Sequence, residues 1–202
     1  MFRLLCFLVI VNVASGANIF AIFSTPSLSH QLVFQPIWRE LSLRGHKVTV
    51  VTPNPLNDPT LTNLTEINVS HSYSIFSLQA FIDNSHLLPD KLMSISVGYF
   101  IKPIIESQLN YSDVLKILKD KNAHFDLVIS EMFCAPAYGF AYKFNAPWVG
   151  MLSLPDVSTA AMAVGNPMHP VINPEGGLGY GKHLSFWQRV VSTYAHIRCI
   201  LR

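Results

Sequence analysis

Two side chains suited to acid–base chemistry lie just beyond short apolar runs of the chain. His30 follows the run 18–23, Asn-Ile-Phe-Ala-Ile-Phe, and Glu131 follows the run 126–130, Asp-Leu-Val-Ile-Ser. If the carboxylate accepts the proton of one imidazole nitrogen, the other nitrogen is able to take a proton from a hydroxyl group, which is general base catalysis. A single histidine and a distant glutamate more often have structural roles, so the pair depends on the fold to bring it together.

Other kinds of chemistry have weaker signals. No Gly-x-Ser-x-Gly motif surrounds Ser153, which argues against a serine hydrolase. Gly176, Gly177 and Gly179 do not open a helix directly after a strand, so they do not form a phosphate-binding loop. The other histidines show no metal-ligand spacing, and His46, at the start of a predicted strand, is interpreted as structural. We therefore expect no metal and no bound cofactor.

Composition bounds the fold and the partners. The 202 residues suffice for one α/β domain with a well-buried core. With 14 basic and 12 acidic residues and no basic block, the sequence argues against nucleic-acid binding. Half of the residues are hydrophobic and 13% are charged, so we expect part of the apolar surface to need a partner.

The elements that must position His30 are a strand over 18–23, a helix over 28–44 and a strand over 47–52. Gly45 ends the helix where a left-handed cap is wanted. Strand, helix and strand within so short a stretch predict a right-handed βαβ unit with parallel strands. Pro36 lies inside the helix. Either Ser27 or Ser29 caps a helix that bends at Pro36, or the regular helix begins at Pro36.

The rest of the chain extends this alternation. A loop over 54–65 and a weak strand over 66–70 come first. Helical segments follow within 76–118, with breaks near Pro89 and at 110–112, and then a helix over 113–119 that Ser112 caps. Strands over 126–130 and 148–152 flank a helix over 135–144, and a loop over 153–181 leads to a helix over 184–202. The apolar stripe of the last helix packs on the core or docks on a membrane surface or another domain. This order predicts a Rossmann-like, doubly wound parallel sheet, whose ligands bind beyond the carboxyl ends of the strands. His30 and Glu131 both belong to that edge.

Three apolar side chains are expected near the same edge. Met132 and Phe133 follow Glu131 directly, and Met151 ends the strand over 148–152. They are candidates to line an apolar acceptor pocket, and an ordinary core position is an equally good interpretation of each.

The first residues have the pattern of a secretory signal peptide. A charged start is followed by the apolar run 4–13 and by small residues, which predicts cleavage after Gly16 and a mature domain over 17–202. Three glycosylation sequons begin at Asn63, Asn68 and Asn110. Together these features predict a protein of the secretory pathway. Of the cysteines that remain after cleavage, Cys134 and Cys199, we expect buried free thiols.

Three segments carry a resemblance to a known family. The run 27–53, which includes Arg-Gly-His-Lys-Val-Thr, resembles the opening of animal UDP-glycosyltransferases, and the similarity continues through Phe-Asp-Leu-Val-Ile-Ser-Glu at 125–131 and Asn-Ala-Pro-Trp-Val at 145–149. The resemblance implies the acceptor-binding, N-terminal domain of a GT-B enzyme. By motif, His30 matches the base that deprotonates the acceptor for transfer with inversion. Glu131 matches the position where many relatives carry an orienting aspartate.

What the resemblance implies for function is transfer of a hexosyl group from a UDP-sugar, as co-substrate, to a hydroxyl of a small lipophilic acceptor. The full-length family members are associated with the membrane of the endoplasmic reticulum and carry a C-terminal domain that binds the UDP-sugar. No such domain follows Arg202. We therefore expect a fragment that is inactive alone. The alternative is a non-catalytic lumenal module that binds the acceptor or forms a homo- or heterodimer.

Overall fold

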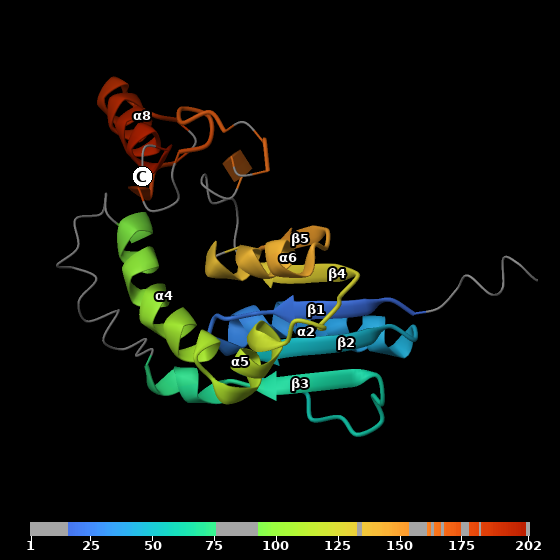
Figure 1. The fold of residues 1–202 in the computed structure, drawn as a ribbon. Coiled ribbons are helices and arrows are strands. Elements are labelled where there is room, and N and C mark those ends of the chain that lie inside the picture. Colours follow the sequence, from blue (N-terminus) through green and yellow to red (C-terminus); the bar gives the residue numbers. More distant parts are fainter. Residues whose placement is uncertain are drawn as a thin grey trace, which may run out of the picture.

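The computed structural model describes residues 16–75, 93–132 and 135–153, and beyond them 161–162, 164–166, 168–174, 178–181 and 183–200. Its centre is a five-stranded sheet in which all neighbouring strands are parallel. The strands are β1 (Asn18–Ile22), β2 (Lys47–Thr52), β3 (Leu64–Asn68), β4 (Leu127–Glu131) and β5 (Trp148–Met151). Figure 1 shows them side by side.

The strand order is β3-β2-β1-β4-β5, which is the doubly wound, Rossmann-like order. The chain proceeds outward from β1 to β3 and then returns to the other side of β1 to add β4 and β5. The order therefore reverses between β1 and β4, which are paired from Ile19 with Leu127 to Ile22 with Ser130. Ligands of such sheets bind at this switch point, and it is where His30 and Glu131 follow their strands.

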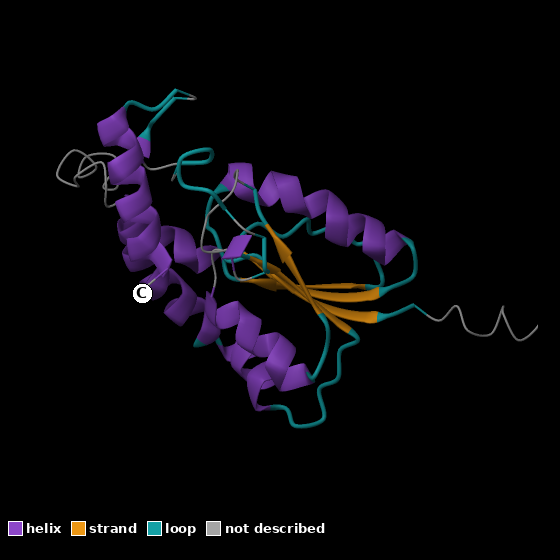
Figure 2. Ribbon diagram, turned by 90° about the horizontal axis from the view of Figure 1, so that it is seen from above, coloured by secondary structure: helices purple, strands orange, loops and turns teal. Residues whose placement is uncertain are grey.

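Helices cover both faces of the sheet (Figure 2). Helix α2 (Leu28–Leu43) covers one face, and α4 (Met93–Leu109), α5 (Ser112–Lys119) and α6 (Tyr138–Phe144) contribute to the core on the other. Helix α8 (Phe186–Ile200) lies away from the sheet (Figure 1), and short 3-10 turns are at Ser70–Ser74 and Ala135–Ala137. On one face, Phe34 and Trp38 of α2 pack with Phe23, Ile19 and Ala21. Because the sheet is buried on both sides, β1 is apolar at successive positions rather than at alternate ones.

The opposite face carries the second half of the core. Phe20 points to that side from β1, and its ring lies 4.6 Å from Phe140 of α6 and 5.3 Å from Phe125. Val114 of α5 and Phe144 of α6 belong to the same cluster. The predicted α/β layering is confirmed, and the core on both faces fixes the strands whose ends carry the polar side chains.

Helix α2 includes Pro36 instead of beginning there. The helix begins at Leu28 and continues through Pro36 to Leu43, and Ser27 is the N-cap residue with an extended backbone. The Ser27 side chain does not cap the helix; its Oγ lies 3.0 Å from the Oγ of Ser29 instead. Gly45 has a φ of 86°, so the predicted left-handed turn after the helix is confirmed.

Several predicted boundaries were shifted. The strand expected over 66–70 is β3 at Leu64–Asn68, and the helix expected over 135–144 begins with a 3-10 turn, with Pro136 near its start. Ser112 is the first residue of α5 rather than its cap, because the N-cap residue is Tyr111. Pro103 lies inside α4 without ending it. The predicted break near Pro89 lies outside the described residues.

Helix α8 has an unusual arrangement of its two faces. Most of its predicted apolar stripe is exposed, namely Trp187, Val190, Tyr194 and Ile197, together with Phe186, whereas Leu184 just before the helix is buried, as are Ser192 and His196 on the other face. In the described part of the chain most of the stripe therefore does not pack on the core, and docking on a membrane surface or another domain stays a prediction. Among the described residues, no helix is both long and apolar enough to cross a membrane.

Candidate active site

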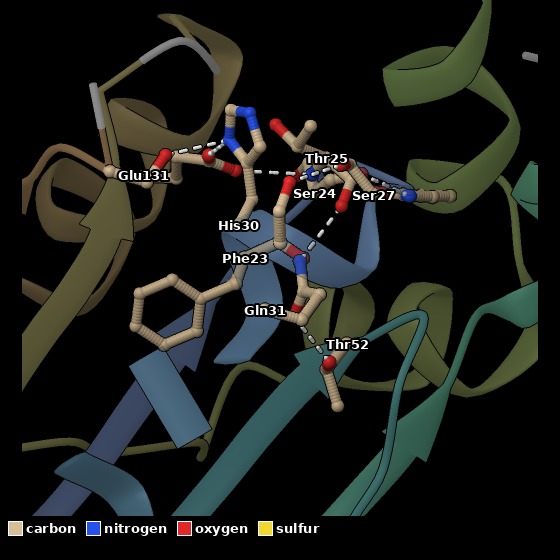
Figure 3. Close-up of polar contacts among 11 residues, drawn as sticks. Phe23, Ser24, Thr25, Ser27, His30, Gln31, Thr52 and Glu131 are labelled. Atoms are coloured by element: carbon tan, nitrogen blue, oxygen red, sulfur yellow. Dashed lines mark hydrogen bonds and ion pairs between the residues drawn. The ribbon is translucent and has the colours of Figure 1, made fainter. Parts of the chain in front are cut away.

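His30 and Glu131 meet at the carboxyl edge of the sheet (Figure 3). Glu131 is the last residue of β4, and His30 lies in the first turn of α2, whose start the chain reaches through residues 23–27 after β1. Nδ1 of His30 lies 3.0 Å from Oε1 of Glu131. The Glu131 side chain is fully buried, whereas that of His30 is 17% exposed, so the imidazole is the member of the pair that solvent and a ligand reach.

The carboxylate of Glu131 is held at both oxygens. Oε1 faces the imidazole, and Oε2 accepts the backbone N–H of Thr25 at 3.1 Å. The backbone bond ties the carboxylate to the loop between β1 and α2, so strand β4 and that loop fix its position together. The Glu131 carboxylate thus reaches the histidine directly.

This contact determines which imidazole nitrogen is basic. An ionised carboxylate only accepts hydrogen bonds, so Nδ1 carries the hydrogen that it donates to Glu131. The lone pair of the neutral ring is then on Nε2, which points away from Glu131 in Figure 3. The arrangement is that of an oriented general base.

Ser153 is a third side chain at this site; the sequence suggested it only as a hydrolase nucleophile and did not predict its contact with His30. It follows β5 by two residues, and its Oγ lies 2.6 Å from Nδ1 of His30. A serine hydrolase needs the serine on one ring nitrogen and the acid on the other, whereas here both face Nδ1. The hydrolase interpretation therefore fails on geometry. The sequence does contain one signal for this contact: Ser153 lies just beyond the end of a third predicted parallel strand.

Two buried glutamines hold the loop that precedes His30. Gln31 donates from Nε2 to the carbonyl oxygens of Phe23 at 3.2 Å and Thr25 at 2.8 Å, and its Oε1 accepts the hydroxyl of Thr52 at 2.8 Å. Gln108 of α4 donates to the carbonyl of Ser24 at 2.8 Å. Both glutamine side chains are fully buried. The loop therefore has its carbonyl groups bound from two helices, which places the Thr25 N–H against Glu131.

The three apolar candidates do not form one group. Met151 pairs in register with Glu131 and packs with the core on the α2 face, which is the face of His30. Met132 lies on the other face: a Cβ on Gly150 would come within 2.7 Å of its Cγ, so Gly150 leaves room for it beside Trp148. Phe133, like Cys134, lies outside the described residues. Acceptor contact by Met132, Phe133 and Met151 stays a prediction.

His46 has a structural contact, as predicted. Its Nδ1 accepts the backbone N–H of Ala17 at 3.0 Å, at the amino end of β1 and so away from the dyad. Within the part of the chain that the structure describes, no cluster of three or more histidine, cysteine or acidic side chains is placed to hold a metal ion.

The known proteins that this sequence resembles are all named as UDP-glycosyltransferases or UDP-glucosyltransferases. UDP-glucosyltransferase 2 of Dactylopius coccus is 28% identical over 97% of this chain, and UDP-glycosyltransferase UGT4 of the same organism is 27% identical over 92%. An ecdysteroid UDP-glucosyltransferase of Choristoneura fumiferana defective polyhedrosis virus is 30% identical over 86%. The chain spans 36 to 38% of the length of these relatives.

No protein-family model matches the sequence. Among solved structures, the glycotransferase of kitacinnamycin aligns with 73% of this chain and 33% of its own, at 18% identity and a TM-score of 0.46. The sequence relatives cover nearly the whole chain and share one named activity class. The chain belongs to the UDP-glycosyltransferase family and corresponds to the N-terminal half of its members.

Proposed function

We propose that this chain forms the acceptor side of an inverting UDP-glycosyltransferase, in which His30 is the general base. The reaction is transfer of a hexosyl group from a UDP-sugar to a hydroxyl of a small lipophilic acceptor. The single observation that carries the proposal is the 3.0 Å contact between His30 Nδ1 and the buried carboxylate of Glu131 at the switch point of the sheet. A partly exposed imidazole on a buried carboxylate has the form that general base catalysis requires.

The mechanism follows from the protonation state of the ring. Nε2 takes the proton of the acceptor hydroxyl while the hydroxyl oxygen attacks the anomeric carbon of the sugar and the bond to UDP breaks. The imidazolium that forms is stabilised by the negative charge of Glu131. Glu131 thereby orients the ring and compensates its charge without changing its own protonation.

Binding of the UDP-sugar is assigned to the part of the family's sequence that this chain does not span, since the chain covers 38% of the first relative. We propose that the acceptor side and the donor side face each other across a cleft, as in GT-B enzymes. No further cofactor takes part in the reaction that we propose.

The test is transfer of radiolabelled hexose from UDP-glucose and UDP-glucuronic acid to a panel of lipophilic alcohols and phenols. We expect transfer by the complete polypeptide that carries this sequence and none by chain 1–202 alone, because the chain lacks most of the relatives' length. Absence of transfer by the complete polypeptide to every acceptor, with the protein folded and UDP-sugar bound, would contradict the proposed activity.

A second candidate is a non-catalytic lumenal module that binds the acceptor or forms a dimer. The exposed stripe of α8, with Phe186, Trp187 and Tyr194, favours this function, because exposed apolar patches mark interaction surfaces. Such a module would bind acceptors but would show no transfer in any polypeptide that contains it. The same assay therefore separates the two candidates.

We also propose residence in the secretory pathway, in the lumen of the endoplasmic reticulum or at its membrane. The signal-peptide pattern over 1–16 motivates this, and its apolar run lies outside the described residues. The sequon asparagines Asn63, Asn68 and Asn110 are all exposed, so each is accessible to a glycan.

Glycosylation gives a direct test of this residence. We expect the chain expressed in a secretory eukaryotic host to lose mass on peptide N-glycosidase treatment, and Asn63→Gln, Asn68→Gln and Asn110→Gln each to remove one step of that loss. Edman sequencing of the product is expected to begin at Ala17. An unglycosylated product that retains residues 1–16 would contradict the lumenal assignment.

A further inference from the structure

Polar side chains that follow three adjacent strands meet at Nδ1 of His30. Loop and helix after β1 supply His30, the end of β4 supplies Glu131, and the residue two positions beyond β5 is Ser153. Nδ1 of His30 lies 3.0 Å from the carboxylate oxygen of Glu131 and 2.6 Å from the hydroxyl oxygen of Ser153. The proposed mechanism gives Ser153 no role.

The protonation of Nδ1 determines whether Ser153 donates a hydrogen bond to the ring or accepts one from it. The nitrogen holds either one hydrogen or one lone pair. If Ser153 donated its hydrogen to a bare Nδ1, the carboxylate of Glu131 would face the same lone pair without a hydrogen between them. With the hydrogen on Nδ1, both oxygens accept it, and the serine's own O–H bond points away from the ring.

We propose that Ser153 is a positioning residue for His30, whose hydroxyl oxygen is the second acceptor of the Nδ1 hydrogen. The contact with Glu131 restrains the rotation of the imidazole about its bond to Cβ from one side only. Two acceptors, one from the end of β4 and one from beyond β5, restrict that rotation and fix the direction of Nε2. The proposal rests on the proposed function, because the direction of Nε2 matters only if that atom takes a proton from the acceptor.

The first experiment observes the ring directly, without catalysis. In ¹⁵N-labelled chain 1–202, with His30 signals assigned through a His30→Gln variant, we expect the hydrogen on Nδ1. In Ser153→Ala the hydrogen stays there, because Glu131 remains, but it exchanges with water about 3- to 10-fold faster, the factor that one hydrogen bond is worth. Ser153→Thr, which keeps the hydroxyl, is expected to restore slow exchange.

The matched control is Ser74→Ala. Ser74 is exposed in the 3-10 turn after β3, the edge strand farthest from β5, and its hydroxyl donates to the carbonyl of His71. We expect the Nδ1 hydrogen of His30 in Ser74→Ala to exchange at the same rate, and the ring to have the same tautomer, as in the unchanged chain. A bare Nδ1 in the unchanged chain, or exchange in Ser153→Ala that is no faster than in the control, would overturn the proposal.

The second experiment measures transfer in the complete polypeptide. We expect Ser153→Ala to lower kcat about 3- to 10-fold with the acceptor KM within about 2-fold, and Ser153→Thr to recover it, because a misdirected base affects the transition state more than acceptor binding. An unchanged kcat would overturn the positioning role, and so would a loss that follows a lower melting temperature instead of the missing hydroxyl. If His30→Ala were fully active, the proposed function would fail, while the exchange measurement would still decide whether Ser153 holds the ring.

Discussion

Replacement of His30 by alanine is expected to reduce sugar transfer by the complete polypeptide about 100-fold or more. General base catalysis contributes roughly that factor or more, and alanine removes the only nitrogen atoms at this position that can take a proton from the acceptor. The 17% exposure of the His30 side chain places it where an acceptor can reach it. The measurement is kcat at saturating UDP-sugar, with kcat/KM for the acceptor beside it.

A matched histidine controls for general effects of the substitution. His124 is highly exposed and pairs with Asp126 at 3.3 Å just before β4, at the amino edge of the sheet, so His124→Ala should leave transfer unchanged. Activity of His30→Ala within about 10-fold of the unchanged enzyme would remove His30 from the role of base, because it falls below what a general base contributes. A loss in both variants would indicate damage to the fold instead.

Replacement of Gln31 by alanine is expected to lower the free energy of unfolding of the chain by about 3 kcal/mol. The side chain is fully buried and makes three hydrogen bonds, to two loop carbonyls and to the hydroxyl of Thr52. Alanine leaves those partners buried without their donor or acceptor, and each such group costs roughly 1 to 3 kcal/mol. Urea unfolding followed by circular dichroism measures the change.

Gln35 provides the control on the same helix. It lies one turn further along α2, is only partly buried and donates to the carbonyl of Asn54 at 2.9 Å. We expect Gln35→Ala to cost about 1 kcal/mol, the value of a single hydrogen bond. Equal effects of the two substitutions would show that the buried network around Gln31 does not hold the loop.

The Gln31 substitution also connects stability to the site. Gln31 fixes the carbonyl of Thr25, and the N–H of Thr25 donates to Glu131. A loosened loop would release one of the two contacts that hold the carboxylate. We therefore expect transfer to fall in Gln31→Ala even at temperatures where the protein remains folded.

Much of the fold was predictable because its signals are local. Buried parallel strands favour runs of apolar and β-branched residues, which 18–23 and 47–52 have, and the helix between them is followed by Gly45, whose φ is positive. The shifted boundaries, such as β3 and the start of α5, occur where hydrogen bonding across the sheet or along the helix decides and residue preference is weak.

The side of α8 that faces the protein was not predictable. Its apolar stripe is plain in the sequence, but periodicity identifies a stripe without indicating what covers it. In the structure Ser192 and His196 are buried and Trp187 is exposed. Only contacts between distant segments settle that choice, and Ser192 makes one of them to the carbonyl of Pro170.

The sequence by itself determined the parallel α/β fold and the presence of His30 and Glu131 at strand ends, because apolar runs and turn residues act over short distances. Only the tertiary structure decided that Nδ1 of His30 lies within hydrogen-bonding distance of Glu131 and Ser153. It also separated Met132 from Met151 by the two faces of the sheet. The reason is that strand order and register, which depend on packing across the whole sheet, set the distances between residues far apart in the chain.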